Sequence, residues 1–262
     1  MNTGLQGKVA LITGASKGIG KAIALAFATE GVRLGLCARD DRQLKLTADE
    51  IQINTHADVI AVKANVTKLN DIHRFVSAAA EKFGRIDILV NNAGGAHIGG
   101  ILTTADEDWE YHLQLKLLGY IRTAREVIPY MKQNGGRIIN IVGTAAKEPR
   151  AVYMVSGVTN AALLNFTKTL SRELEPDRIL VNSINPGTTD TPLTVETFKA
   201  IAALSQKTPE EVRETSIASS PQKRLATPED IANVAVFLAS DAANFINGTS
   251  INVDAGKMFG LW

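Results

Sequence analysis

The chain has 262 residues, 45% of them hydrophobic and 21% charged, which are the proportions of a folded globular protein and not of a disordered or membrane-embedded one. Its 28 Lys and Arg against 27 Asp and Glu leave a net charge of +1, so no overall field would draw the chain to nucleic acid or an anionic membrane. A single cysteine, Cys37, excludes an internal disulfide framework and a cysteine-rich zinc site. The sequence has neither a signal-peptide pattern nor a run of about 18 apolar residues. We therefore expect a cytoplasmic protein that binds a small molecule and no metal, nucleic acid or membrane.

Short β-branched runs alternate along the chain with longer Ala- and Leu-rich stretches. The runs predict strands at residues 9–13, 33–37, 59–62, 86–90, 137–142, 179–184 and 250–253. The longer stretches predict helices, among them 21–30, 69–83, 105–132, 160–175 and 228–239. A repeated strand-then-helix order predicts an α/β fold, with a doubly wound parallel sheet and helices on both faces. Because no repeat or linker divides the chain, we expect residues 1–262 to form a single domain.

The strand rhythm lapses between residues 188 and 227, where Thr, Ser, Pro and Lys are frequent. Insertions of about forty residues in a compact domain are commonly binding loops or lids. We expect a substrate lid at about 188–227.

A glycine-rich segment, Thr-Gly-Ala-Ser-Lys-Gly-Ile-Gly at residues 13–20, follows the first strand and opens a helix. In that setting glycines let backbone N–H groups approach a pyrophosphate at the helix N-terminus. The alternative is a tight connection that needs positive φ and holds no ligand. As a ligand loop, the segment predicts cofactor contacts from Gly14, Ser16, Lys17, Gly18, Ile19 and Gly20.

The second strand ends in Cys37-Ala38-Arg39-Asp40, without an acidic residue where one would accept hydrogen bonds from the ribose hydroxyls of NAD. Arg39, assisted by Lys17, would instead face a 2′-phosphate. The competing interpretation is a solvated surface charge, which is the usual state of an isolated arginine. Together with the glycine loop, Arg39 predicts NADP(H) as the cofactor.

Two polar turns close later strands: Asn-Asn-Ala-Gly at residues 91–94 and Asn-Pro-Gly-Thr-Thr-Asp-Thr at 185–191. Each sequence, taken by itself, could simply form a turn, because Asn, Gly and Pro favour turns. Both nevertheless fall at the carboxyl edge of the predicted sheet, where open α/β sheets bind ligands. The glycine loop lies at the same edge, so we expect one shared crevice.

These motifs, with the terminal Asn-Gly-Thr-Ser-Ile-Asn-Val-Asp-Ala-Gly at 247–256, stand in the order and at the intervals of the short-chain dehydrogenase/reductase family, which nearly the whole chain resembles. The resemblance implies a Rossmann-type sheet in the order 3-2-1-4-5-6-7, interconversion of a carbonyl and an alcohol, and a homotetramer. It also implies cofactor contacts from Asn65 and Val66 at the adenine, from Asn92, Ala93 and Gly94 at the ribose, and from Pro186, Gly187 and Thr191 at the nicotinamide.

The catalytic positions depart from the family pattern, which is a Tyr-x-x-x-Lys pair, a Ser thirteen residues before the Tyr and an Asn on the preceding helix. Registered on the flanking segments, Ser156 stands at the Tyr position and Asn160 at the Lys position. Gly143 replaces the Ser, and Lys116 replaces the Asn. An alkyl alcohol is a far weaker acid than a phenol beside a lysine, so Ser156 could hold a substrate oxygen but hardly exchange its proton near neutral pH.

Three side chains could supply the missing proton transfer. Tyr153 precedes Ser156 by about one helical turn, Lys116 would bring a cation to the opposite wall, and His97 follows the Asn-Asn-Ala-Gly turn. Each also has a purely structural interpretation, as a packing aromatic, a solvated lysine or a loop residue. We predict that Lys116 and Tyr153 take part in proton transfer, that Ser156 orients the substrate oxygen, and that Asn160 bonds the cofactor ribose.

The sequence thus favours an NADP(H)-dependent oxidoreductase with an altered proton-transfer site. A rival from another class is a catalytically silent family member that binds NADP(H) as a sensor, scaffold or partner subunit, because function lies in the site and not in the fold. Binding of nucleic acid in the crevice, a third possibility, has no basic patch in its favour.

Overall fold

Seven runs of mainly apolar residues form strands within residues 3–259, the part of the chain that this computed structural model describes. They are β1 (Val9–Thr13), β2 (Arg33–Ala38), β3 (Val59–Lys63), β4 (Ile88–Asn91), β5 (Gly136–Ile141), β6 (Ile179–Pro186) and β7 (Ser250–Val253). All neighbouring strands pair in parallel, in the order β3-β2-β1-β4-β5-β6-β7. The predicted α/β class and strand order are confirmed.

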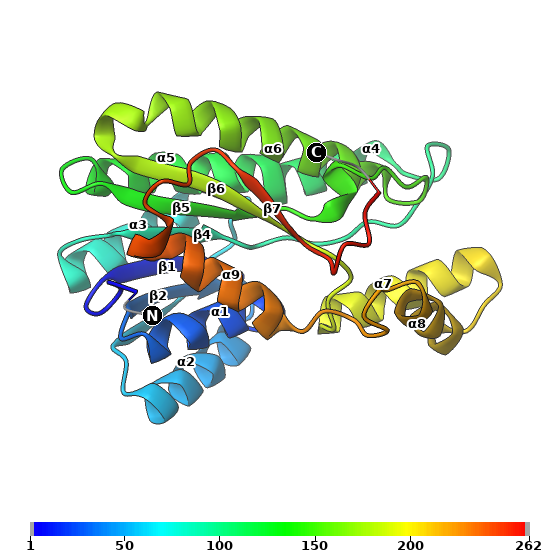
Figure 1. Cartoon of the computed structure of the whole chain (residues 1–262), viewed down its shortest axis with the longest axis horizontal. Helices are drawn as coiled ribbons and strands as arrows, with labels where there is room; N and C mark the ends of the chain where they lie inside the picture. Colours follow the sequence, from blue (N-terminus) through cyan, green and yellow to red (C-terminus); the bar gives the residue numbers. More distant parts are fainter. Residues whose placement is uncertain (1–2, 260–262) are drawn as a thin grey trace.

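Helices cover both faces of the sheet and bury two apolar layers against it (Figure 1). One face carries α1 (Gly18–Thr29), α2 (Asp41–Thr55) and α9 (Pro228–Ala239). The other carries α3 (Leu69–Phe83), α5 (Gly119–Met131) and α6 (Met154–Glu173). β1, Val-Ala-Leu-Ile-Thr, is buried along its whole length. A strand covered by helices on both faces needs apolar side chains on both, which explains its nearly continuous apolar sequence.

The helix predicted at 105–132 is not one regular helix. It divides into α4 (Asp106–His112), a π-helical turn η1 (Leu113–Leu118) and α5. The helix predicted from residue 160 begins six residues earlier, at Met154. Both corrections concern the site, because π turns often reshape a helix at functional positions and the start of α6 carries Ser156.

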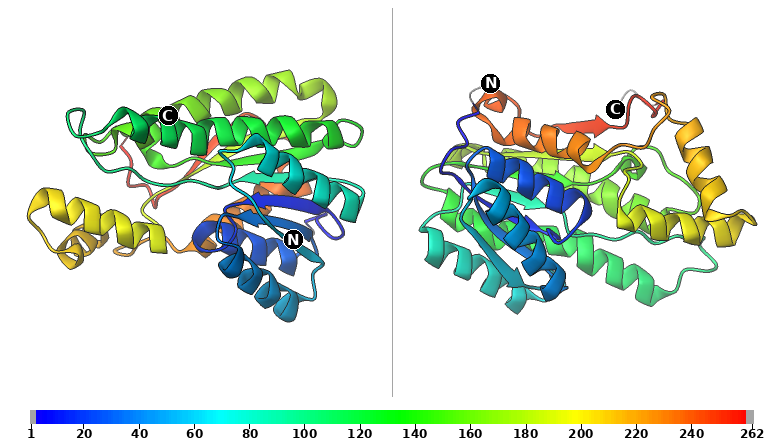
Figure 2. Two further views of the ribbon diagram at one scale, coloured as in Figure 1. Left: turned by 180° about the vertical axis from the view of Figure 1, so that it is seen from behind. Right: turned by 90° about the horizontal axis from the view of Figure 1, so that it is seen from below.

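The segment from 188 to 227 contains two helices that the strand-and-helix rhythm did not predict, α7 (Pro192–Ser205) and α8 (Pro209–Ala218). Thr191 and Thr208 cap their N-termini by accepting hydrogen bonds from Thr194 N and Glu211 N. Phe198, Ala202 and Val212 are buried in a small apolar cluster of their own. The pair extends from the carboxyl end of the sheet, away from its two helical layers (Figures 1 and 2).

A buried amide network joins the central strands to α6. The Asn91 Nδ2 donates to Asn140 Oδ1 at 3.0 Å, and the Asn140 Nδ2 donates to Thr167 Oγ1 at 3.0 Å. Buried polar groups are costly unless they are satisfied, so these bonds favour one relative placement of β4, β5 and α6. That placement sets the walls of the crevice at the carboxyl edge.

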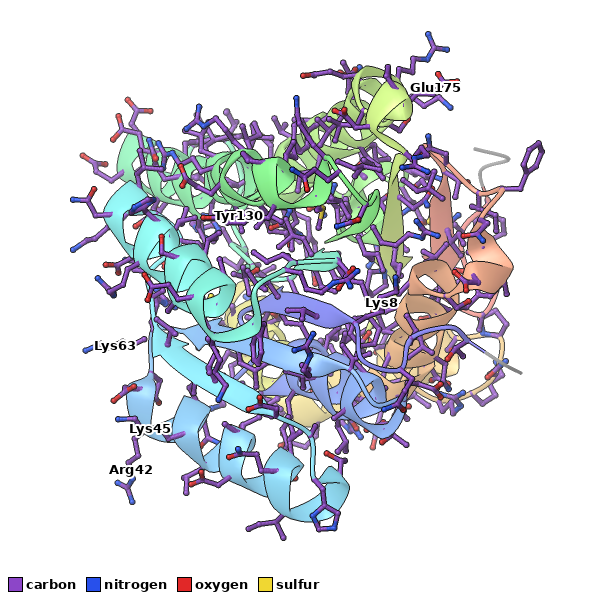
Figure 3. All side chains as sticks on the ribbon, turned by 90° about the vertical axis from the view of Figure 1, so that its left-hand side faces the viewer. Lys8, Arg42, Lys45, Lys63, Tyr130 and Glu175 are labelled. Atoms are coloured by element: carbon purple, nitrogen blue, oxygen red, sulfur yellow. The ribbon has the colours of Figure 1, made fainter. Side chains whose placement is uncertain are left out.

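Short turns complete the described chain: η2 (Thr144–Ala146), η3 (Glu175–Asp177) and η4 (Asp241–Ala243). Charged side chains such as Arg42, Lys45 and Lys63 point outward from α2 and β3 (Figure 3). Over residues 3–259, no helix has both the length and the apolar character needed to cross a membrane.

Candidate active site

A cavity of about 840 Å³ lies at the carboxyl ends of the central strands. The glycine loop forms one wall, the turn after β4 and the start of α6 form others, and the turn after β6 leads from it into α7. Its size lies within the range of about 300–1,000 Å³ that is typical of small-molecule and cofactor sites. The structure therefore brings the predicted motifs together in one crevice.

Close contact between two turns shapes the floor of the cavity. Thr13 Oγ1 accepts hydrogen bonds from Asn92 N and Ala93 N, and the Asn92 Nδ2 donates back to Thr13 O at 2.9 Å. Gly14 has φ +66°, and a Cβ there would lie 2.8 Å from Ala93 Cα. Glycine is thus required at Gly14 both for its backbone conformation and for the approach of the β4 turn.

Most residues predicted to contact the cofactor line the cavity: Gly14, Ser16, Lys17, Gly18, Ile19, Arg39, Val66, Asn92, Ala93, Gly94, Asn160, Pro186, Gly187 and Thr191. Gly20 and Asn65 do not. Gly20 is buried, and a Cβ there would collide with Asn92 Nδ2, so its smallness serves packing. The Asn65 Oδ1 already accepts hydrogen bonds from Thr67 N and Oγ1.

Two cations, Arg39 and Lys17, stand at the β2 end of the cavity. The Arg39 Nη1 donates to the Tyr111 hydroxyl at 2.5 Å, which joins the end of β2 to α4. The adjacent Asp40 accepts from Gln43 N at 3.0 Å and caps α2. Asp40, the carboxylate next to Arg39 in the sequence, is therefore bound to the backbone at the N-terminus of α2.

Lys116 reaches the cavity from η1 on the opposite wall. Its stem lies beside Gly94, where a Cβ would be 3.6 Å from Lys116 Cδ, and its Nζ donates to Val142 O at 2.5 Å. No carboxylate within residues 3–259 pairs with this ammonium. Burial lowers the pKa of Lys116 to about 8, because the charged form loses hydration. The side chain is mostly protonated at pH 7 and can still give up a proton.

The two residues at the altered family positions on α6 present unused polar atoms. Among the described residues, Ser156 Oγ and Asn160 Oδ1 are buried and have no hydrogen-bond partner. Both side chains line the cavity. A buried polar atom without a partner is costly, so these two atoms stand out among the polar groups of the residues that line the cavity.

Gly143 and Asn160 fit together. Gly143 has φ +128°, and a Cβ there would lie 3.0 Å from Asn160 Nδ2. The amide of Asn160 therefore fills the space beside residue 143, and the backbone there is one that favours glycine.

Tyr153 lines the cavity and is the N-cap residue of α6, so it stands just before the helix and not within it. Its ring lies 5.9 Å from the Arg150 guanidinium carbon, and the neighbouring Val152 O accepts from Gly99 N. Burial raises the pKa of the Tyr153 phenol, and the positive charge of Arg150 offsets this only in part. Of the two predicted proton carriers, Lys116 is the better acid.

His97 is outside the cavity lining, and its Nε2 is 3.1 Å from Thr104 Oγ1. The histidine that lines the cavity is His112, which the sequence interpretation missed. The available signal was its spacing: His112 precedes Lys116 by four residues, which places both on one side of a helix.

Comparison with known proteins identifies the family. The family model described as enoyl-(acyl carrier protein) reductase matches residues 14–257. The 3-oxoacyl-[acyl-carrier-protein] reductase FabG of Thermotoga maritima is 35% identical over 258 residues, covering 96% of this chain and 98% of that protein. The chain belongs to the short-chain dehydrogenase/reductase family. It is therefore an oxidoreductase by descent, as predicted.

Further relatives match nearly the whole chain. The uncharacterized oxidoreductase YvrD of Bacillus subtilis is 32% identical over 261 residues, covering 98% of each chain. L-sorbose reductase from Gluconobacter frateurii, solved with NADPH and L-sorbose, superposes with a TM-score of 0.94 at 36% identity over 100% of both chains. The 3-ketoacyl-(acyl-carrier-protein) reductase from Brucella melitensis, solved with NADH, has a TM-score of 0.86 at 34% identity, covering 97% of this chain and 99% of that one.

The residues present fit a nicotinamide dinucleotide. The glycine loop offers backbone N–H groups at the start of α1. The unpartnered Asn160 Oδ1 can accept a hydrogen bond from a ribose hydroxyl. Lys116 and Ser156 place an ammonium and a hydroxyl-bearing side chain in the lining of the same cavity.

Proposed function

We propose that the protein is an NADP(H)-dependent oxidoreductase that interconverts a carbonyl and an alcohol, with Lys116 in place of the usual tyrosine as proton carrier. The observation that carries this proposal is a part-buried ammonium, Lys116, that lines the same cavity as the unpartnered Ser156 hydroxyl. Preference for the phosphorylated cofactor is supported by Arg39 and Lys17. L-sorbose reductase, the relative solved with NADPH, has the same fold over its full length.

When bound, the nicotinamide supplies or accepts the hydride. In the direction of reduction, Ser156 donates a hydrogen bond to the carbonyl oxygen and fixes its position. The Lys116 ammonium transfers a proton to that oxygen as negative charge develops on it. In oxidation the neutral amine takes the proton back. Asn160 Oδ1 accepts a hydrogen bond from the cofactor ribose and contributes no charge.

Tyr153 is the second candidate as proton carrier, and its raised pKa makes it the weaker one. We propose α7 and α8, within the segment 188–227, as the lid. Phe198 of α7 lines the cavity, and the short polar link through Thr188 and Thr189 joins it to β6. Closure of such a lid would exclude water from the reacting oxygen.

The test is absorbance-monitored oxidation of NADPH on a panel of ketones, aldehydes and keto acids, preceded by calorimetric titration of NADPH and NADH. The proposal predicts tighter binding of NADPH and turnover of at least one carbonyl class. Tight binding of NADPH with no turnover on the panel would favour the silent cofactor-binding protein instead.

A further inference from the structure

One cation of the cavity lining, Arg150, has no role in the chemistry described above. It follows β5 and the turn η2, shortly before α6 begins, whereas Arg39 follows β2. Because β1 and β4 lie between β2 and β5, about 14 Å separates those two strands in the sheet. Arg150 therefore stands on the α6 side of the cavity, with Ser156, and not on the side assigned to the cofactor 2′-phosphate.

The turn before α6 fixes the place of the Arg150 guanidinium. Arg150 O accepts a hydrogen bond from Tyr153 N at 2.9 Å, and the guanidinium carbon is 5.9 Å from the centre of the Tyr153 ring. Tyr153 O in turn accepts from Gly157 N at 2.7 Å, in the first turn of α6 that carries Ser156. Arg150 and Ser156 thus belong to one hydrogen-bonded segment, and both line the cavity.

The carboxylates around the cavity leave Arg150 loosely paired. Within residues 3–259 its ion-pair partner is Glu148, whose Oε2 is 3.7 Å from Arg150 Nη2, beyond hydrogen-bond distance. That oxygen is buried and has no hydrogen-bond partner among the described residues. Glu196, which lines the cavity from α7, pairs with Lys199 on its own helix at 2.9 Å. The planar fork of N–H donors on Arg150 is therefore available to a further carboxylate, which it fits with two hydrogen bonds.

The other charges close to Arg150 are held by the protein. Burial and then the positive charge of Arg150 lower the pKa of Lys257, while Glu148 and Asp254 oppose them. The Lys257 Nζ donates to Ser219 Oγ at 2.8 Å, and Asp254 accepts from two backbone N–H groups of the turn after β7. Arg150 lines the cavity and these other charged side chains do not, so it presents the charge of this corner to a ligand.

We propose that the substrate is an oxo acid, whose carboxylate Arg150 binds while Ser156 and Lys116 act on its carbonyl. The proposal rests on the function proposed above and names the substrate class of that same site. A monoanionic carboxylate matches the single free guanidinium, whereas a phosphate dianion would bring more charge than one cation offsets. Attachment at two points holds the carbonyl in one orientation to the nicotinamide, which a ketone without the carboxylate would lack.

The kinetic test compares each acid with its uncharged form. The intact protein and NADPH are given 2-oxopentanoate and 4-oxopentanoate, each beside its methyl ester. For at least one pair, kcat/KM should favour the acid about tenfold, the lower end for hydrogen bonds between charged groups, because the Arg150 side chain is 36% exposed. In Arg150→Gln this preference should disappear, and Arg150→Lys, which keeps the charge without the fork, should retain part of it.

The matched control is Arg42→Gln. Arg42 lies on α2, is exposed and points away from the body of the protein (Figure 3). The preference for the acid over the ester should therefore be that of the intact protein.

A second readout needs no turnover. Each oxo acid is titrated by calorimetry into the protein saturated with NADP⁺, which cannot reduce it. Arg150→Gln should weaken the binding of the preferred acid about tenfold. Glu148→Gln should strengthen it about twofold, because the carboxylate that competes for Arg150 is removed.

The outcomes separate this proposal from the one on which it rests. Equal turnover of acids and esters by the intact protein, or an Arg150→Gln protein that keeps both the preference and the affinity, would overturn the substrate class and leave the oxidoreductase standing. Absence of hydride transfer to any carbonyl would overturn the proposed function and this inference with it.

Discussion

Replacement of Lys116 by methionine removes the amine but keeps an unbranched side chain of similar length against Gly94. The charge lost is one that no described carboxylate neutralises, and within residues 3–259 the hydrogen bond lost is that to Val142 O. General acid assistance is worth about 10²–10⁴-fold, or roughly 3–5 kcal/mol of transition-state stabilisation. We expect kcat for reduction to fall by that factor while the Kd of NADPH changes little.

The pH profile distinguishes a proton carrier from a packing residue. Reduction requires the ammonium, so the intact rate should be level below the Lys116 pKa of about 8 and fall as pH rises through it. Oxidation requires the neutral amine and should rise over the same range. In Lys116→Met both changes near pH 8 should be absent.

Lys45→Met is the matched control. Lys45 lies on α2, pairs with Asp41 at 2.8 Å and points away from the body of the protein (Figure 3). Its removal should leave rate and pH profile as they were. A Lys116→Met protein that binds NADPH and retains either full activity or the change near pH 8 would refute Lys116 as proton carrier.

Three further substitutions test other parts of the site. Arg39→Ala should weaken NADPH binding about ten- to a hundred-fold and leave NADH nearly unchanged in calorimetry, as expected for a lost hydrogen bond to a charged group; equal losses for both cofactors would contradict the assignment. Tyr153→Phe should lower kcat less than about tenfold, below the general-acid range, and a larger loss would transfer the catalytic role to Tyr153. Gly143→Ser restores the family's serine but forces a side chain onto φ +128° beside Asn160, so urea unfolding should show a loss of about 1–3 kcal/mol. Gly100→Ser, with open space at its Cβ, is its control and should lose much less.

The sheet could be predicted because short β-branched runs alternate regularly along the sequence with stretches of helical length. β1, β7, α3 and α9 have the bounds that the pattern predicts. A strand that is buried on both faces must consist almost entirely of apolar residues, so its sequence is easy to recognise.

The elements that the sequence did not reveal are those whose form depends on contacts elsewhere. The π turn η1 interrupts an apolar pattern that is continuous in sequence, so periodicity alone predicts one helix over 105–132. The helices α7 and α8 had a local signal in Thr191-Pro192 and Thr208-Pro209, where a capping threonine precedes a proline. The surrounding polar composition obscured it.

The candidate site divides in the same way. Registration on the family motifs predicted that Lys116, Ser156 and Asn160 share one cavity, and all three line it. The neighbourhood of His112 was not predictable, because it depends on how the turn at Gly95 lies against α4. Nor was the fit between Gly143 and Asn160, which joins residues seventeen positions apart.

Transfer of deuteride from NADPH labelled at nicotinamide C4 tests the central claim most directly. The intact protein, NADPH with deuterium on each face of C4 in turn, and the carbonyl panel are incubated, and the alcohols are analysed by mass spectrometry. We predict an alcohol that carries one deuterium on the former carbonyl carbon, from one face only, and its near absence with Lys116→Met. Tight binding of NADPH without any deuterated alcohol from the intact protein would contradict the claim that this altered site performs the chemistry of its family.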